Sequence, residues 1–501
     1  MTLIKNCQKN PGLLACLVNI GCAMLLFQEM GCKLNENCSN RDCMVTGVKN
    51  KNYKFPAGHN RLQSLLASVS FLKDPIGTIS KNMQLFSGTY SGYLLGSGRF
   101  IITENPDFIQ YILRDNHTNY EKSALSTKTA ARLFGKGLLF SNGEAWLKQR
   151  RLIQPAFHQG KIQGLFEIVA DTASLFVERM PEGEHLDLYQ LMHNLSFTVL
   201  VHSLFDINLS EEMISGLSES FTDLQDFLLK DINQPLRRLV YPFNRADRTI
   251  LRKSERIRKI LKKIIEERRA ETDNHNDLLD MLLNVRYEDT GLNMAEDQIM
   301  DEISVLLFAG HETTANTLSW ILYLLATHPE VARKLKSAIT GVGIYESPKD
   351  EYINAVISEG MRLYPSAWMT ERVALKDDQF GEFSYPKGTI IIPFFYGLHR
   401  NKKFWNEETE FKPERFIYSG PLKGKKIKNF FPFGAGPRMC IGNNFAMMEM
   451  AIVLHLMLSH FEILPTAEIP ELWPLITLRP RRLHLGLKSI KANAMVVNEV
   501  S

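Results

Sequence analysis

The chain has 501 residues, of which 45% are hydrophobic and 23% are charged. These proportions are typical of a globular protein and exclude a disordered or fibrous chain. The net charge of +4 is too small to indicate nucleic acid as a partner. A chain of this length folds as one large domain or as two ordinary ones, and length alone does not separate the two cases.

The cysteines are distributed unevenly along the chain. Six occur in the first tenth, and the only other is Cys440. The six are Cys7, Cys16, Cys22, Cys32, Cys38 and Cys43. The body of the chain therefore has no internal disulfide, which indicates a reducing, intracellular compartment, where a lone cysteine is a ligand, a nucleophile or a buried apolar residue. The early cysteines lack the paired spacing and the histidines of a zinc site.

Residues 1–52 are predicted to be a leader. Residues 11–27 are almost wholly apolar, but they fall short of the about 20 residues that a membrane-spanning helix needs. The basic residues on the two flanks are too evenly balanced to set an orientation. A short membrane anchor, a cleaved signal and a disordered extension all stay open. We therefore expect a location that is cytoplasmic or membrane-associated through residues 11–27.

Residues 53–501 are predicted to form one domain and to act as a monomer. Two runs separated by glycines predict a hairpin within 90–104, mixed β-branched and aromatic runs predict strands within 372–398, and residues 473–488 predict another hairpin. Apolar residues at three- and four-residue spacing predict helices over 144–158, 161–180, 186–206, 211–230 and 247–270. Residues 295–327 predict a helix of about 50 Å. The expected fold class is mainly α, a large multihelical domain with a small β-rich part.

The strongest functional signal is the segment FPFGAGPRMCIG, residues 431–442. Its glycines and proline predict a compact turn, and a helix is predicted to begin just beyond Cys440. The positive end of that helix and its free amide donors favour the thiolate form of the cysteine over the thiol. A thiolate on a haem iron promotes O–O cleavage. An inert buried cysteine would not require the surrounding glycines, so we predict that Cys440 is an iron ligand.

This segment resembles the ligand loop of the cytochrome P450 superfamily. The residues that carry the resemblance are Phe433, Gly434, Gly436, Arg438, Cys440 and Gly442. The resemblance extends from about residue 53 to the last predicted hairpin and implies the fold of that family with a haem b cofactor. It implies that Cys440 binds the iron, that Phe433 and Gly434 belong to the haem-binding loop, and that Arg438 pairs with a haem propionate.

Two further motifs fit the same family. Glu359 and Arg362 are three residues apart on a predicted helix, and Arg415 follows downstream. Alone, such pairs are mostly solvent-exposed and contribute little to stability. The resemblance implies instead a buried structural network of all three residues. Within the long helix, AGHETT places Glu312 beside Thr313, after a glycine that costs about 1 kcal/mol relative to alanine. A locally opened helix carrying an acid and a hydroxyl could deliver protons, and the resemblance implies that role for this pair.

Haem propionates need cationic or hydrogen-bonding partners. Trp146 and Arg150 lie one helical turn apart in WLKQRR, and Arg372 lies in WMTERV. By the resemblance, these three residues contact the propionates. The alternative for each is a core or surface residue without a haem contact.

The resemblance implies a monooxygenase that inserts one atom of O₂ into a hydrophobic substrate. The fatty-acid and long-chain hydroxylase branch is the most similar, and terpenoids and sterol-like molecules come second. The chain shows no dinucleotide-binding fingerprint, so NAD(P)H would act through a separate ferredoxin or flavoprotein reductase. Two alternatives are a haem-thiolate isomerase or peroxygenase, which would not need the acid–hydroxyl pair, and a non-enzymatic haem sensor.

A basic run precedes the ligand loop. Four lysines occupy residues 421–429, namely Lys423, Lys425, Lys426 and Lys428. This run, extended by Lys148 and Arg151, is predicted to steer an acidic electron donor toward the cysteine side of the haem. The alternative is a solvated loop with no partner.

Overall fold

The computed structural model describes residues 52–94, 98–205, 210–233, 246–271, 275, 277–287, 289–417, 427–466 and 468–490. The apolar segment at 11–27 and three of the four lysines in the basic run therefore lie outside the described residues. Among the residues that are described, no helix is both long and apolar enough to cross a membrane.

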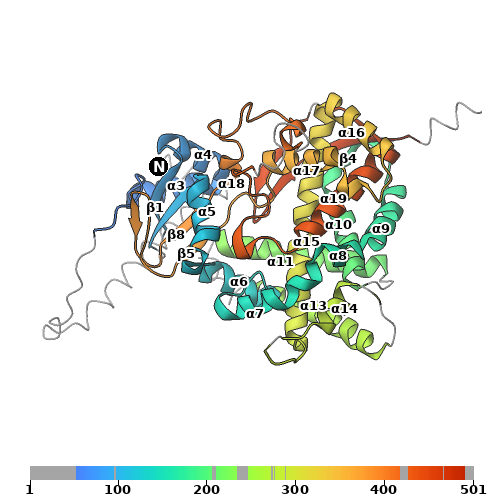
Figure 1. Cartoon of the computed structure of the whole chain (residues 1–501), viewed down its shortest axis with the longest axis horizontal. Helices are drawn as coiled ribbons and strands as arrows, with labels where there is room; N and C mark the ends of the chain where they lie inside the picture. Colours follow the sequence, from blue (N-terminus) through green and yellow to red (C-terminus); the bar gives the residue numbers. More distant parts are fainter. Residues whose placement is uncertain are drawn as a thin grey trace, which may run out of the picture.

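Helices make up most of the described chain (Figure 1). The longer ones are α3 (Arg61–Lys73), α4 (Pro75–Leu85), α6 (Ala124–Phe134), α7 (Gly143–Ile153), α9 (Phe166–Glu178), α10 (Leu188–Phe205), α11 (Glu211–Asn233), α13 (Ala246–Ala270), α15 (Glu296–Thr327), α16 (Pro329–Gly341), α17 (Glu351–Leu363) and α19 (Asn443–His460). Shorter α-helices are α5 (Pro106–Gln110), α8 (Gln159–Gln163), α14 (Leu278–Asn284) and α18 (Phe395–Leu398). Single turns are η1 (Tyr111–Asp115), η2 (His117–Asn119), η3 (Gln154–Phe157), η5 (Ser347–Lys349), η6 (Pro413–Phe416) and η7 (Gly436–Arg438).

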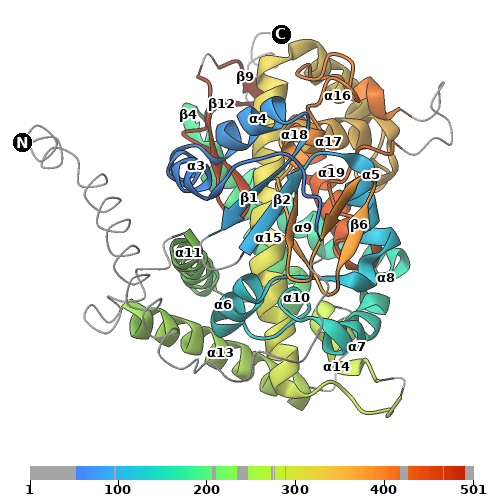
Figure 2. The same ribbon diagram turned by 90° about the vertical axis from the view of Figure 1, so that its left-hand side faces the viewer.

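The long helix α15 runs through the middle of the molecule (Figure 2). Its second half is apolar on every side, and Leu318, Trp320 and Leu322 are all buried. A helix that is apolar all round must be covered all round, which explains its central place. It packs most extensively against α10, and a Cβ at Gly310 would come 2.8 Å from a methyl carbon of Leu200. The glycine therefore allows the close approach of these two helices.

Short strands form the β-rich part. They are β1 (Thr89–Leu94), β2 (Gly98–Thr103), β3 (Tyr120–Glu121), β4 (Gly183–Asp187), β5 (Arg372–Ala374), β6 (Asp378–Phe380), β7 (Phe383–Tyr385), β8 (Ile390–Pro393), β9 (Phe461–Leu464), β10 (Glu471–Pro474), β11 (Leu478–Arg481) and β12 (His484–Ser489). The largest sheet has the order β1-β2-β8-β5-β3, in which β2 and β8 are parallel and the other pairs antiparallel. A second sheet has the order β4-β12-β9, and β6 pairs with β7.

The hairpin predicted over 473–488 is only partly correct. Strands β10 and β11 do form an antiparallel pair. Strand β12 leaves them and pairs with β4 and β9 instead. The chain turns at Arg482, whose φ of +58° is in the left-handed region, and the turn separates the two pairings. The mainly α fold with a small β-rich part agrees with the prediction.

Candidate active site

The ligand loop between β8 and α19 is a chain of tight turns. Gly434 and Gly436 have φ values of +72° and +69°, where side chains are strained. At Gly436, a Cβ would also lie 2.0 Å from the carbonyl oxygen of Leu113 in η1, so no larger residue fits. The amide of Cys440 donates to the carbonyl of Phe433 over 2.9 Å, which closes the loop around the cysteine. Helix α19 begins at Asn443, as predicted.

Cys440 is an exposed residue, although protein atoms crowd its thiol on most sides. Burial raises the pKa of this thiol, while the Gly442 backbone amide and the Arg150 guanidinium lower it. Burial is the larger effect. The Gly442 amide acts in the direction expected from the helix terminus, burial outweighs it, and coordination to a metal would supply the deprotonation.

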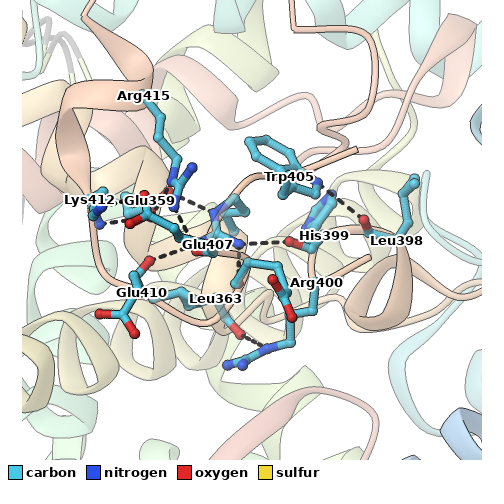
Figure 3. A network of polar contacts seen from close by, with 12 residues as sticks. Glu359, Leu363, Leu398, His399, Arg400, Trp405, Glu407, Glu410, Lys412 and Arg415 are labelled. Carbon is cyan, nitrogen blue, oxygen red and sulfur yellow. Dashed lines mark hydrogen bonds and ion pairs between the residues drawn. The ribbon is translucent and has the colours of Figure 1, made fainter. Parts of the chain in front are cut away.

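A network of buried polar contacts is centred on Glu359 and its neighbours (Figure 3). Arg362 and Glu359 are both fully buried and form a two-bond ion pair at 2.7 and 2.8 Å. The same guanidinium donates to the carbonyls of His399, Glu408 and Glu410. Arg415 adds a 3.2 Å contact to Glu359. Because every charge in this group has a partner, the network is rigid and satisfied.

His399 connects this network to the loop. Its carbonyl accepts from Arg362, and its Nε2 accepts the backbone amide of Phe431 over 3.0 Å. Burial, followed by the charges of Arg362 and Arg400, lowers the pKa of His399 to about 3. The ring is therefore neutral, which leaves Nε2 free to accept the hydrogen bond.

Three cations lie together on the other side of the ligand loop. Burial lowers the pKa values of Arg372 and Arg438, the latter to about 10, and neighbouring Arg372 adds to that effect. Burial and the two guanidinium groups lower the pKa of Lys122 to about 7. Among the described carboxylates, none lies within ion-pair distance of these three groups. The charge of Glu371 opposes all three shifts, and that of Glu121 opposes the shift of Arg438, so the cluster is a mainly positive region in which no ion pair forms among the described residues.

Trp146 and Arg150 lie at different parts of this region. Trp146 is buried on α7, and the guanidinium of Arg438 lies over its ring at 4.1 Å from the centroid. Arg438 also donates to the carbonyl of Ser141 and to Asn142 Oδ1. Arg150 instead donates to the carbonyl of Met439, next to Cys440. The structure therefore brings Trp146 together with Arg438 and Arg372, and it places Arg150 at the cysteine.

Glu312 and Thr313 are neighbours in the middle of α15, but their side chains have different partners. Thr477, in the turn between β10 and β11, donates to Glu312 Oε1 over 2.8 Å. Burial raises the pKa of Glu312, while Thr477 and Arg479 oppose that rise. The Thr313 hydroxyl donates to the carbonyl of Ala309 over 2.9 Å. The helix is continuous from Glu296 to Thr327, so the local opening expected here is absent from this described helix.

These residues fit a haem. A thiolate-ligated iron porphyrin needs one cysteine and cationic partners for its two carboxylates. The thiol of Cys440 supplies the first. The cationic side chains of Lys122, Arg372 and Arg438, none of which forms an ion pair among the described residues, supply the second.

Two residues of this region were not identified from the sequence. Lys122 lies in NYEKS, where a lysine carries no distinguishing signal. Thr477 reaches Glu312 from 165 residues away. Both depend on contacts between distant segments, which periodicity and motif spacing do not reveal.

Comparison with known proteins agrees with this geometry. A sequence model described as Cytochrome P450 matches residues 56–485. A cyclooctat-9-en-7-ol 5-monooxygenase of Streptomyces melanosporofaciens is 32% identical over 383 residues, covering 74% of this chain and 82% of the relative. Cytochrome P450 4A7 of Oryctolagus cuniculus is 27% identical over 447 residues, covering 82% and 85%. A cytokinin hydroxylase of Arabidopsis thaliana is 30% identical over 384 residues, covering 72% and 73%. The chain therefore belongs to the cytochrome P450 family and is a haem-iron monooxygenase.

Proposed function

We propose that this chain binds haem b through Cys440 and inserts one atom of O₂ into a hydrophobic substrate, using electrons from a separate protein. The observation that carries the proposal is the crowded thiol of Cys440, two residues from Arg438 in a cluster with Arg372 and Lys122 that forms no ion pair among the described residues. When bound, a haem with a thiolate ligand supplies the O₂ binding and O–O cleavage that such a reaction needs.

The protein's own residues hold and orient the cofactor. The propionates pair with Arg372, Arg438 and Lys122. The ring of Trp146 packs against the Arg438 guanidinium and positions it. Phe433 and Gly434 shape the loop beside the sulfur. Arg150 fixes the loop backbone at Met439 and places a positive charge near the cysteine, which favours the anionic sulfur.

Glu312 and Thr313 handle protons. Glu312 borders a small recess of about 10 Å³, the space of about one water molecule. Tyr189, Asp226 and Arg479 also line this recess, so a proton can reach the carboxyl from its polar side. Because burial raises its pKa, Glu312 can hold a proton and release it. The Thr313 hydroxyl takes part after it turns away from the Ala309 carbonyl.

Aromatic side chains pack beside the Glu312 segment of α15. Phe308 immediately precedes Ala309 and contacts Phe134 and Phe140, with ring centroids 4.4 and 5.5 Å apart. Phe221 of α11 stacks on Phe134 at 6.1 Å. These rings belong to the packed core, so the proposal of a hydrophobic substrate, a fatty acid, a terpenoid or a sterol-like molecule, rests on the family and the named relatives. The relative named for cyclooctat-9-en-7-ol makes a cyclic unsaturated alcohol the first candidate to test.

A ferredoxin or a flavoprotein reductase would dock on the surface formed by α7 where this helix contacts the ligand loop. Arg151 is exposed on α7, one residue after the arginine that contacts Met439. Lys148 is also exposed and pairs with Asp289 at 3.3 Å. Charge reversal at Arg151 should slow haem reduction by an acidic donor and reduce its dependence on salt. Reversal at Lys73 on the distant helix α3 is the matched control, and equal rates for both variants would contradict this docking face.

Turnover tests the proposal as a whole. The haem-loaded chain is incubated with NAD(P)H, a reductase system and a panel of fatty acids, terpenoid alcohols and sterols. We expect one substrate class to give a product with one added oxygen atom, labelled when ¹⁸O₂ is used. Conversion without O₂ would favour an isomerase, conversion with peroxide alone a peroxygenase, and no conversion of any class a haem sensor.

A further inference from the structure

Two histidines and a glutamate meet at the surface, away from the residues described above. They are His185 on β4, His484 on β12 and Glu468 in the segment before β10. The potential ligand atoms of the three side chains all lie within 4.8 Å of one another. His185 Nδ1 is 3.8 Å from Glu468 Oε1, and His484 Nδ1 is 3.5 Å from Glu468 Oε2.

The sheet β4-β12-β9 brings these residues together (Figure 2). Strand β12 is antiparallel to β4, with His484 opposite Asp187. Residues two apart on a strand face the same side, so His185 is the diagonal neighbour of His484 on one face. Their rings stack with centroids 4.0 Å apart and an angle of 20° between the planes. Glu468 then reaches both rings from a third segment.

We propose that His185, His484 and Glu468 form a binding site for a divalent transition-metal ion of the Zn²⁺ class. Two donors that are each about 2.1 Å from one tetrahedral ion lie about 3.4 Å apart. The observed separations of 3.5 and 3.8 Å are close to that value. Two imidazoles and one carboxylate suit zinc and similar metals, whereas Mg²⁺ and Ca²⁺ prefer oxygen ligands only. The fourth position of the tetrahedral ion takes water.

A simple ion pair explains the arrangement less well. It would require protonated rings, and two imidazolium groups stacked at 4.0 Å repel each other. A metal ion binds both rings in the neutral form and places its charge between them and the carboxylate. An ion bound to an imidazole nitrogen lies in the plane of the ring, so binding requires the two rings to turn out of their stack toward Glu468.

The site would join segments that reach the candidate active site. Strand β4 leads directly into α10, which carries Tyr189 of the recess at Glu312. Glu468 precedes the β10–β11 hairpin, whose Thr477 holds Glu312. A bound ion would therefore fasten the hairpin to the start of α10.

Calorimetry on the haem-loaded full chain tests the proposal. The thiols outside the haem are first alkylated, so that the cysteines of residues 1–52 cannot bind the metal. On titration with ZnCl₂, we expect one ion per chain and a rise in melting temperature, with no response to MgCl₂. In His185→Ala and Glu468→Gln, binding should weaken roughly 10- to 100-fold or more, since even partners outside the ligand shell carry that much affinity.

The matched control is His158→Ala, which removes an exposed histidine elsewhere and should leave zinc binding unchanged. Because all three ligands are at the surface, the metal-free variants should fold with wild-type haem spectra. Equal zinc affinity and stoichiometry in the wild type, His185→Ala and Glu468→Gln would overturn the site, as would the absence of zinc binding in the wild type.

Discussion

Opposing effects act on the sulfur of Cys440. Burial raises the pKa of the thiol. The Gly442 backbone amide and the Arg150 guanidinium lower it, but they do not compensate. The cysteine is consequently a protonated thiol until a metal binds it. Coordination to iron releases that proton, so haem uptake should become weaker as the pH falls.

At Thr313, a single hydroxyl carries the proposed proton relay. In Thr313→Ala, we expect consumption of O₂ and NAD(P)H to continue while product falls and peroxide rises, because electrons still arrive but protons are misdirected. Thr327→Ala is the control, since Thr327 makes the same bond to the carbonyl four residues earlier at the far end of α15. Unchanged coupling of electrons to product in Thr313→Ala would exclude this residue from the relay.

Lys122 was not identified from the sequence, and its substitution tests the proposed propionate contacts. Hydrogen bonds to charged groups contribute about 1.5–3 kcal/mol. Lys122→Met should therefore weaken haem binding roughly 10- to 100-fold, as measured by transfer of haem to a competing apoprotein. Lys128→Met, at an exposed position of the neighbouring helix α6, should retain the wild-type affinity. Equal haem transfer from both variants would contradict the assignment.

Among the elements, the predictions succeeded where the signal is local. Helix α15 and the ligand loop follow from an unbroken apolar pattern and from glycines at required turns. Strand β12 was assigned to the wrong pairing, because its partners β4 and β9 are chosen by packing between distant segments. The same limit applies to the site, where Cys440 was recognisable from its loop but Lys122 and Thr477 were not.

The buried ion pair of α17 should contribute far more to the free energy of unfolding than an exposed ion pair does. Glu359→Gln leaves the fully buried charge of Arg362 uncompensated, which costs about 3–5 kcal/mol. Glu414→Gln breaks the exposed pair with Lys334 and should cost about 0–1 kcal/mol. Chemical denaturation measures both values. A loss below 1 kcal/mol in Glu359→Gln would show that the network does not support the fold.

For the whole molecule, buried histidines lower the free energy of unfolding as the pH falls. Burial lowers the pKa of His399 and His311 to about 3 and that of His193 to about 4. In the unfolded chain these rings titrate near pH 6.5, so below that pH the unfolded state binds more protons. The free energy of unfolding therefore falls as the pH falls, by at most about 1.4 kcal/mol per pH unit for each histidine.

Several carboxyls with a pKa raised by burial, Glu104 and Glu312 among them, oppose this trend over part of the range. Burial raises the pKa of Glu302 to about 7 and that of Glu449 to about 8. Both stabilise the folded state as the pH falls toward about 4.5, where their contribution levels off. We therefore expect the steepest loss of stability below about pH 4.5 in denaturation followed by circular dichroism. A constant midpoint from pH 6 to pH 3.5 would contradict the neutral, buried state of the histidines.

The central claim is that Cys440 binds the iron of a haem, and the absorption spectrum of the reduced carbon-monoxide complex tests it most directly. We expect the wild type and Cys43→Ser, which changes a leader cysteine, to give the thiolate-type spectrum. Cys440→Ser should fold with the same circular dichroism but lose that spectrum, because an alcohol is a poor anionic ligand at neutral pH. A thiolate-type spectrum that persists in folded Cys440→Ser would contradict the account.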